Sequence, residues 1–215
     1  MEPSRYDAWY HTSKGAWISE RETALMLRLL QPGPGDSLLD VGSGTGHFTR
    51  RFSDKGLGVT GLEPDREMLH FARYKHPDLR FVRGDANALP FPDGSFDFVA
   101  AVTCLCCVSS PEAALLEMWR VARHGMLIGL LNRKSLLYRR KAGKGGYRGV
   151  RWDDPSAVRK WGMLLDPSAK LERWGTAVFF PGGTIPARMI EHLLPSRLPW
   201  GGFLAVFWGQ KGGGG

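Results

Sequence analysis

The chain has 215 residues, of which 43% are hydrophobic, so it suits one domain with a single core. This composition excludes global disorder, and no apolar run reaches the roughly 18 residues that a membrane helix needs. The formal net charge of +8 permits an anionic substrate, a nucleic acid or an acidic membrane surface, and selects none of them.

The elements expected from hydrophobic periodicity alternate between helix and strand, which predicts a parallel sheet covered by helices. In chain order we expect a helix at 19–30, a strand at 37–41, a helix at 47–55, a strand at 58–62, a helix at 66–74 and strands at 79–82 and 96–102. There follow a helix at 111–121, a strand at 126–131, a helix at 155–165, a strand at 170–180, a helix at 186–194 and a strand at 202–208.

The segments between and around these elements complete a single domain that spans residues 1–211. Residues 1–30 are expected to form an N-terminal helical cap. Residues 132–152 are basic and rich in glycine, with little apolar periodicity, and are expected to form a loop or lid. The final residues 212–215 are all glycine and are expected to be a disordered tail.

The positive charge and the cysteines are each confined to one part of the chain. Residues 133–160 contain ten basic and two acidic residues, so this segment carries the whole excess of +8. The cysteines, Cys104, Cys106 and Cys107, lie within four positions and cannot form a long-range disulfide framework. Thiols of this kind predict a reducing, cytoplasmic location.

A glycine-rich turn, Gly42–Gly46, connects the strand at 37–41 to the helix at 47–55. Glycine lets the backbone approach a ligand closely, and the N-terminus of the following helix favours a carboxylate or phosphate. A tight connection between strand and helix would also use such glycines. The turn does not predict a phosphate-binding P-loop, because no Gly-Lys-Ser/Thr follows it.

Two acidic residues follow the next two strands. Glu63 ends the strand at 58–62, about 20 residues after the glycine turn, where nucleotide-binding sheets place a carboxylate on ribose hydroxyls. This position fits a dinucleotide or an adenosyl ligand, and a solvated loop carboxylate would look the same. Asp85 follows the strand at 79–82 and would accept a hydrogen bond from an adenine amino group, or would serve as an ordinary turn aspartate.

These features belong to four blocks that occur in order and at fitting spacing: Leu38–Gly46, Leu62–Leu69, Gly84–Phe98 and Glu117–Leu131. Together the blocks resemble the class I S-adenosylmethionine-dependent methyltransferases, in particular the small-molecule group called methyltransferase type 11. The resemblance covers most of residues 6–131, and the strand at 202–208 fits the family's last strand. It implies an α/β Rossmann-like fold, with a seven-stranded, mostly parallel sheet, helices on both faces and an antiparallel last strand.

The resemblance also implies the cofactor, S-adenosyl-L-methionine, and the residues that hold it. The methionine part would be cradled by Asp40, Gly42, Ser43, Gly44 and Gly46. Glu63 would hold the ribose hydroxyls, with Pro64, Asp65 and Met68 beside the adenosine, and Asp85 and Ala86 would read the adenine edge. Residues 103–105, with Thr103 and Cys104 as site residues, would face the methionine end and the methyl group. Tyr6 begins an aromatic segment, Tyr6–Tyr10, that would cover the cofactor, although a surface helix with packed aromatic residues shows the same pattern.

The reaction implied is methyl transfer to a small-molecule acceptor, for which an anionic or thiol-like compound fits the charge and the cysteines. Positioning and exclusion of water would supply much of the acceleration. A thiolate needs no base, whereas a hydroxyl or ammonium group does. Tyr10, His11 and His124 are weak candidates for that base, so no catalytic residue is assigned. The sequence predicts no metal site, and small apolar packing explains the cysteines better than capture of a soft metalloid.

The segment 132–152 carries no family motif, which leaves the substrate open. Another departure is Arg123-His-Gly125, where relatives have Pro-Gly-Gly, in a turn away from the cofactor. One alternative is an RNA methyltransferase that uses the basic segment 133–160, with Tyr138, Tyr147 and Trp152 as stacking residues. Another is a cofactor-binding regulator without activity. An oxidoreductase is excluded because position 47, where G-x-G-x-x-G needs glycine, is His47.

Overall fold

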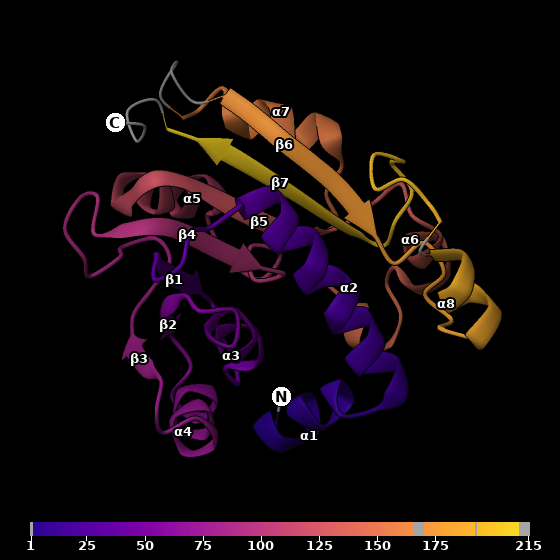
Figure 1. Ribbon diagram of the computed structural model, residues 1–215, viewed down its shortest axis with the longest axis horizontal. Coiled ribbons are helices and arrows are strands. Elements are labelled where there is room, and N and C mark those ends of the chain that lie inside the picture. Colours follow the sequence, from indigo (N-terminus) through magenta and orange to yellow (C-terminus); the bar gives the residue numbers. More distant parts are fainter. Residues whose placement is uncertain (1, 166–169, 192, 211–215) are drawn as a thin grey trace.

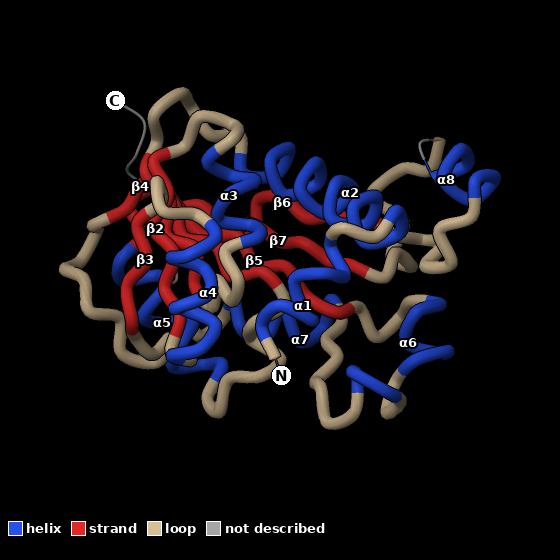
Figure 2. The backbone as a smooth tube through the Cα atoms, turned by 90° about the horizontal axis from the view of Figure 1, so that it is seen from below, coloured by secondary structure: helices blue, strands red, loops and turns tan. Residues whose placement is uncertain are grey.

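The computed structural model describes residues 2–165, 170–191 and 193–210, which build a seven-stranded sheet with helices on both faces (Figures 1 and 2). The strands are β1 Ser37–Val41, β2 Gly58–Glu63, β3 Arg80–Arg83, β4 Phe96–Val102, β5 Ala122–Leu131, β6 Lys170–Ala177 and β7 Phe203–Gly209. Their order is β3-β2-β1-β4-β5-β7-β6. In this described sheet β7 runs antiparallel to both β5 and β6, and all other neighbouring pairs are parallel. The predicted fold class and the antiparallel last strand are therefore confirmed.

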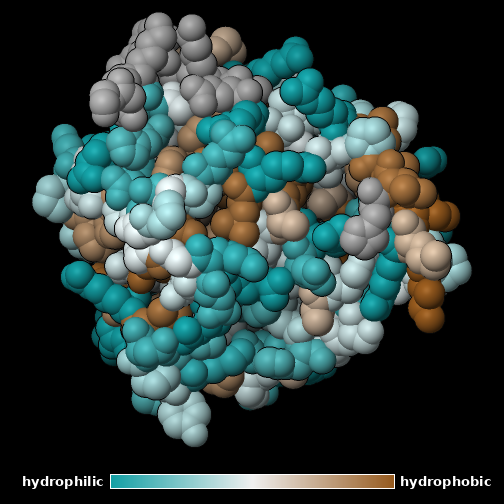
Figure 3. Space-filling model, viewed as in Figure 1, coloured by the Kyte–Doolittle hydropathy of each residue, from teal (hydrophilic) through white to brown (hydrophobic). Residues whose placement is uncertain are grey.

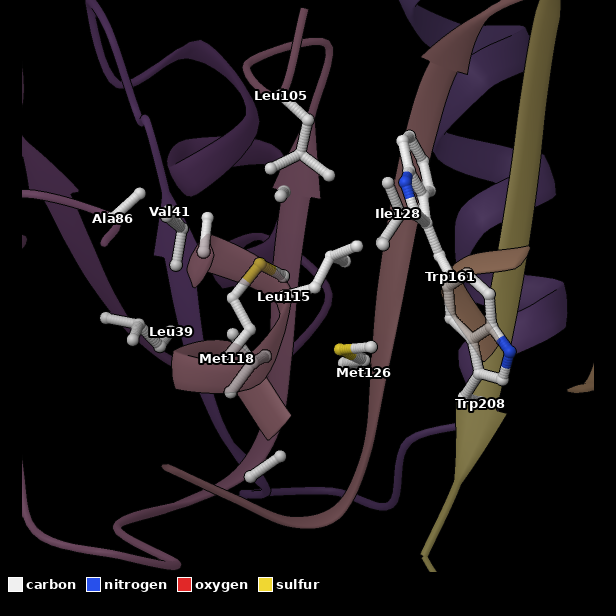
Figure 4. Packing of buried hydrophobic residues seen from close by; sticks show 14 of the residues in the cluster. Leu39, Val41, Ala86, Leu105, Leu115, Met118, Met126, Ile128, Trp161 and Trp208 are labelled. Atoms are coloured by element: carbon white, nitrogen blue, oxygen red, sulfur yellow. The ribbon is translucent and has the colours of Figure 1, made fainter. Parts of the chain in front are cut away.

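The helices of the described chain are α1 Pro3–Tyr10, α2 Ser13–Leu30, α3 His47–Ser53, α4 Arg66–Lys75, α5 Pro111–Val121, α6 Leu136–Lys141, α7 Pro155–Gly162 and α8 Ile185–Glu191. Neighbouring residues of a strand point to opposite faces of the sheet. Leu39 joins a buried cluster with Met118 of α5 and Trp161 of α7 (Figure 4). Leu38 joins a second cluster with Phe52 of α3 and residues of α2. The sheet thus has one apolar layer on each face.

Two predicted elements begin earlier in the structure than their sequence patterns indicated. α2 starts at Ser13 instead of residue 19, because the hydroxyl of Thr12 accepts a hydrogen bond from the backbone N–H of Gly15 (3.0 Å) and caps the helix. β5 starts at Ala122 instead of residue 126, because Ala122 pairs with Phe96 through an irregular register before the regular ladder begins.

The segment 132–152 was expected to be a loop, and it contains α6 and a 3₁₀ helix, Gly145–Tyr147. The hydroxyl of Ser135 accepts a hydrogen bond from the backbone N–H of Tyr138 (3.0 Å), which caps α6. Arg139, Arg140 and Lys141 occupy the last turn, where positive charge is favourable. The predicted tail at 212–215 lies outside the described residues.

No helix within the described ranges has both the length and the apolar character needed to cross a bilayer. Apolar side chains gather on the surface at the end of the molecule that carries α8 (Figure 3). Ile185, Met189 and Leu193 are exposed there. The sheet, in contrast, is covered on both faces, so the positions that concern function are the loops at the strand ends.

Candidate functional site

The glycine turn lies at the carboxyl end of β1 and leads into α3. Gly42, Gly44 and Gly46 all have positive φ, at 73°, 55° and 80°, a region that favours glycine. The backbone N–H groups of Gly42 and Ser43 both donate to the carbonyl of Leu62 on β2 (2.8 and 3.0 Å). These bonds connect the turn to the end of β2, where Glu63, the predicted ribose-binding residue, is located.

Glu63 is buried directly behind the glycine turn. Its carboxylate accepts hydrogen bonds from the backbone N–H of Gly44 (2.8 Å) and from that of Asp65 (3.1 Å). Burial raises the pKa of Glu63, and the two backbone donors oppose this rise. Each carboxylate oxygen can accept a second hydrogen bond, so two hydroxyl groups of a ligand can be held here.

Asp40 lies inside the turn rather than at its surface. Only 2% of Asp40 is exposed, and its carboxylate accepts a hydrogen bond from the hydroxyl of Thr49 on α3 (2.7 Å). Burial raises the pKa of Asp40 to about 6, the Thr49 bond lowers it, and the nearby Glu63 raises it further. No sequence signal marked Thr49, which pairs with Asp40 only because the turn folds α3 back over β1.

The third loop follows β3, which pairs with β2 in parallel and places Arg83 beside Glu63. Asp85 therefore lies at the same edge of the sheet as Glu63. The Asp85 carboxylate is exposed and accepts hydrogen bonds from the backbone and side-chain N–H groups of Asn87 (2.9 and 3.1 Å). Ala86 is buried behind it. The structure thus gives Asp85 a turn role and leaves its remaining acceptor positions available to a ligand.

Pro64 and Met68 lie on either side of the N-terminus of α4, which is capped by Asp65. The Asp65 side chain accepts from the backbone N–H groups of Glu67 and Met68, both at 2.9 Å. Pro64 is exposed and Met68 is half-buried. Both are therefore available beside a ligand held by Glu63.

The loop after β4 closes the site from the opposite side. β4 ends at Val102 and Thr103 has a positive φ of 51°, so the strand does not continue through the cysteines. A turn follows, in which the backbone N–H of Cys107 donates to the carbonyl of Cys104 (2.9 Å). The side chains of Cys104 and Cys106 therefore do not alternate as in a strand. A Cβ on residue 42 would lie 2.9 Å from the Cys104 sulfur, so this loop touches the glycine turn.

α1 covers the glycine turn and contacts the rest of the site through residues near its start and its end. Near the start of α1, the Tyr6 ring lies over Gly44. A Cβ added to Gly44 would be 4.0 Å from the Cε1 atom of Tyr6. Near the end of α1, the Tyr10 ring stacks on His47 of α3, with centroids 3.7 Å apart. Asp7 is buried and forms an ion pair with Lys75 of α4 (2.6 Å). α1 therefore lies against α3 and α4, the helices that follow the glycine turn and the loop after β2.

The three candidate bases differ in position. Tyr10 lies at the site, and burial raises the pKa of its phenol well above the ordinary value, so it stays protonated at neutral pH. His11 is largely exposed and contacts Asp7 (3.1 Å). His124 lies 3.5 Å from Asp97, near the start of β4, at the opposite edge of the sheet from the glycine turn. None of the three is placed to accept a proton at the site.

The basic residues of 133–160 point to solvent. All of them except Arg151 are exposed. The aromatic residues of the same segment lie against one another instead, with the Trp152 ring 5.3 Å from the rings of both Tyr138 and Tyr147. The charge of this segment therefore lies on its outer surface, and its aromatic groups lie inside.

One acidic residue near the site was missed by sequence reasoning. Glu22 lies within the predicted helix at 19–30 and is half-buried in α2. Burial raises its pKa to about 8, and the guanidinium of Arg51 on α3 lowers it. A glutamate in a helix is ordinarily solvated, so its spacing alone gave no signal.

Comparisons with known proteins agree with this geometry. Residues 39–128 match the family model described as "Methyltransferase domain". A demethylmenaquinone methyltransferase from Renibacterium salmoninarum is 44% identical over 92 residues, which are 43% of this chain and 39% of the relative. A malonyl-acyl-carrier-protein O-methyltransferase from Serratia marcescens is 38% identical over 104 residues, which are 47% of this chain and 41% of the relative. The match thus spans about two fifths of each relative's length.

Solved structures extend the likeness to nearly the whole chain. A SAM-dependent methyltransferase from Thermotoga maritima has a TM-score of 0.70 at 23% identity, covering 97% of this chain and 96% of that chain. A TehB-like SAM-dependent methyltransferase from Corynebacterium glutamicum has a TM-score of 0.66 at 18% identity, covering 97% and 98%. At these identities the likeness shows the fold. Residues 39–128 thus match a methyltransferase domain, and the described chain has the fold of solved SAM-dependent methyltransferases.

Proposed function

We propose that this protein transfers a methyl group from S-adenosylmethionine to a small-molecule acceptor. The match of residues 39–128 to a methyltransferase domain and the shared fold with solved SAM-dependent methyltransferases support this cofactor. The observation that carries the proposal is the arrangement of Glu63, which is buried behind the glycine turn with free acceptor positions on both oxygens. The relatives matched by sequence are named for methyl transfer to demethylmenaquinone and to a malonyl group on a carrier protein, which supports a small-molecule acceptor.

The residues present fit an adenosyl and methionine ligand. The buried Ser43 hydroxyl and the Asn87 side-chain oxygen have no hydrogen-bond partner among the described residues, so both are available to a polar ligand. Gly44 has no Cβ between its backbone and Tyr6, which permits close approach of a ligand to the backbone. Ser43 and Gly44 lie on the glycine turn beside Glu63, and Asn87 lies on the loop that carries Asp85.

In the proposed assignment, each part of the cofactor has its own loop. The glycine turn, with Asp40, Gly42, Ser43, Gly44 and Gly46, would hold the methionine part. Glu63 would bind the ribose hydroxyls, with Pro64 and Met68 beside the adenosine, and Asp85 and Ala86 would bind the adenine edge. Thr103 and Cys104 would border the methyl group. Tyr6 would cover the ligand from α1.

When bound, the cofactor supplies an electrophilic methyl group on a sulfonium. The protein's part is to hold an acceptor atom in line with that methyl group and to keep water away. α1 serves the second purpose, because Tyr6 and Tyr10 are buried or half-buried over the glycine turn and Lys75 anchors the helix through Asp7. Reaction at the sulfonium creates no new charge, so positioning contributes more than electrostatic stabilisation.

The experiment that tests this function uses the full chain and methyl-labelled S-adenosylmethionine. The acceptors are a panel of small amines, phenols, thiols and carboxylic acids, with total RNA as a separate sample. We expect label in at least one small molecule, and loss of that label in Glu63→Ala but not in Glu67→Ala, an exposed residue of α4. Label in RNA alone would support the nucleic-acid alternative. Cofactor binding without transfer to any acceptor would support a regulator without activity.

A further inference from the structure

Glu22 is a half-buried carboxylate near the middle of α2 that no described residue satisfies. No hydrogen bond or ion pair reaches its side chain within the part of the chain that the structure describes. A carboxylate taken out of water without a partner is costly. A group in this state next to a ligand site is a candidate to bind part of that ligand.

The position of Glu22 on α2 directs it toward the cofactor-binding loops. Ser19 lies one turn before Glu22 on the same face of the helix, and Thr23 is the residue directly after Glu22. The Ser19 hydroxyl lies 2.5 Å from the Nε2 of His47, and the Thr23 hydroxyl accepts a hydrogen bond from the Nε of Arg51 (2.9 Å). Both partners belong to α3, which starts at the glycine turn. Glu22 is therefore fixed on the side of α2 that faces the site.

Three tyrosines of two other elements lie near Glu22. The Tyr10 ring stacks on His47, with centroids 3.7 Å apart, and His47 contacts Ser19, one turn before Glu22. Tyr6 and Tyr10 come from α1, and their hydroxyl oxygens are 3.1 Å apart. Tyr147 comes from the 3₁₀ helix of the segment 132–152. Burial is the main cause of the raised pKa of each phenol, and the Glu22 carboxylate adds to it in all three. Glu22 thus lies between the helix that covers the cofactor site and the segment that adjoins it.

The charge around Glu22 favours a cationic ligand. Arg51 is the cation that most affects its pKa, and the Nε of that guanidinium is already bonded to Thr23. The basic residues of 133–160 lie on the outer surface, apart from Arg151, which forms an ion pair with Asp153 (3.1 Å). Tyrosine rings present a negative face to a cation, and aromatic groups with a carboxylate are the usual surroundings of a bound ammonium group.

We propose that Glu22 and the three tyrosines form the acceptor site and that the acceptor is an amine, which enters as its ammonium form. This inference rests on the proposed function. The net charge and the cysteines suggested an anionic or thiol-like acceptor. The residues that line the site favour an amine instead. The buried indole N–H of Trp152, which has no partner among the described residues, lies beside Tyr147 and would bind a polar group further along the acceptor.

The reaction then balances with Glu22 as the proton acceptor. The ammonium group gives one proton to the Glu22 carboxylate and becomes a neutral amine with a lone pair. The amine nitrogen forms the new N–C bond as the C–S bond breaks, and the electron pair of that bond stays on sulfur. The products are a methylated ammonium ion and the neutral thioether S-adenosylhomocysteine. Glu22 returns its proton to water when the product leaves.

A binding measurement tests the site without turnover. The probes are benzylamine and a small set of primary amines, with benzyl alcohol and the matching alcohols as neutral controls, titrated into the full chain saturated with S-adenosylhomocysteine. We expect at least one amine to bind at least tenfold more tightly than its alcohol. Because Glu22 is mostly protonated at pH 7 when the site is free, amine binding should release on the order of one proton, measured in buffers of different ionisation enthalpy.

The variants separate Glu22 from its neighbours. Glu22→Gln should weaken amine binding about 10- to 100-fold and abolish the proton release, because it removes a charge-assisted hydrogen bond. It should lower kcat/KM for the amine about 10²- to 10⁴-fold. Glu22→Asp keeps the charge and should lose less. Glu20→Gln, on the exposed side of the same helix, is the matched control and should leave all three measurements unchanged.

Several outcomes would overturn the inference. They are equal binding of amines and alcohols, methyl transfer only to thiols, phenols or acids, and amine binding and turnover within threefold of normal in Glu22→Gln. An equal loss of S-adenosylhomocysteine affinity in Glu22→Gln would assign the residue to the cofactor instead. Failure of the unaltered chain to bind S-adenosylhomocysteine would be a failure of the proposed function itself, and calorimetry with that compound alone distinguishes it.

Discussion

Replacing Gly42 by alanine tests the contact that joins the glycine turn to the loop after β4. The φ of Gly42 is 73°, and an added Cβ would overlap the side chain of Cys104, 2.9 Å from its sulfur and closer to its Cβ. The left-handed backbone costs an L-residue about 1–2 kcal/mol. Overpacking adds about 1–3 kcal/mol. We therefore expect Gly42→Ala to lower the free energy of unfolding by about 2–5 kcal/mol.

Gly56→Ala provides the control for the backbone contribution. The φ of Gly56 is 89°, and an added Cβ meets nothing within 4 Å, so only about 1–2 kcal/mol should be lost. The difference between the two variants measures the overlap with Cys104. In a chain of this size each kcal/mol lowers Tm by about 2–4 °C. Urea unfolding, with thermal melting as a second measurement, resolves the two variants.

A double-mutant cycle identifies the partner of the added methyl group. Cys104→Gly removes the overlapping atoms, so the combined Gly42→Ala and Cys104→Gly variant should recover about 1–3 kcal/mol relative to the sum of the single changes. The reasoning is refuted if Gly42→Ala costs no more than Gly56→Ala, or if the cycle shows no coupling. Either result would mean that the two loops do not meet at the predicted methyl-transfer position.

Three further predictions concern charged groups. Glu63→Gln should weaken S-adenosylhomocysteine binding about 10- to 100-fold by calorimetry, because hydrogen bonds to a charged group are lost, whereas Glu67→Gln should not change it. Lys75→Met leaves the buried Asp7 unpaired and should lower the unfolding free energy by about 3 kcal/mol at pH 7. Since Lys75 lowers the pKa of Asp7 overall, that loss should shrink as the pH falls below about 4, and a loss independent of pH would contradict it. Burial raises the pKa of Asp40 to about 6. The free energy of unfolding of the unaltered chain, relative to that of Asp40→Asn, should therefore fall as the pH rises from about 4 to 6. A difference in urea midpoints that does not change with pH would argue against burial of this carboxylate.

The parallel part of the sheet was predictable because its strands are short apolar runs bounded by turn residues. The predicted bounds of Ser37–Val41 and Phe96–Val102 agree with β1 and β4. Buried parallel strands show such continuous apolar runs, and the loops at their carboxyl ends then follow from the topology. This is why the glycine turn, Glu63 and Asp85 could be brought to one edge of the sheet from sequence alone.

The start of α2 was missed because Gly15 looks like a helix breaker. In the structure an added Cβ on Gly15 would overlap the carbonyl of Trp9, so the glycine permits close packing of α2 on α1. Sequence spacing cannot distinguish a glycine that ends a helix from one that lets two helices touch. The turn of the loop after β4 has no sequence signal either, because Thr103 has a positive φ without being glycine.

The partners of the site residues depend on contacts between distant segments. The ion pair joins Asp7 and Lys75, which are 68 residues apart, and nothing local in the sequence links them. Glu22 is a similar case, because its surroundings come from α1, α3 and the segment 132–152. The cytoplasmic location, inferred from cysteines that are free in the structure, stays a prediction.

A crystal structure of the full chain with S-adenosylhomocysteine tests the central claim most directly. We expect one molecule per chain at the carboxyl ends of β1, β2 and β4, with its ribose hydroxyls within hydrogen-bond distance of the Glu63 carboxylate and its adenine beside Asp85. A molecule bound elsewhere, or loops that stay empty at saturating concentration, would contradict the account.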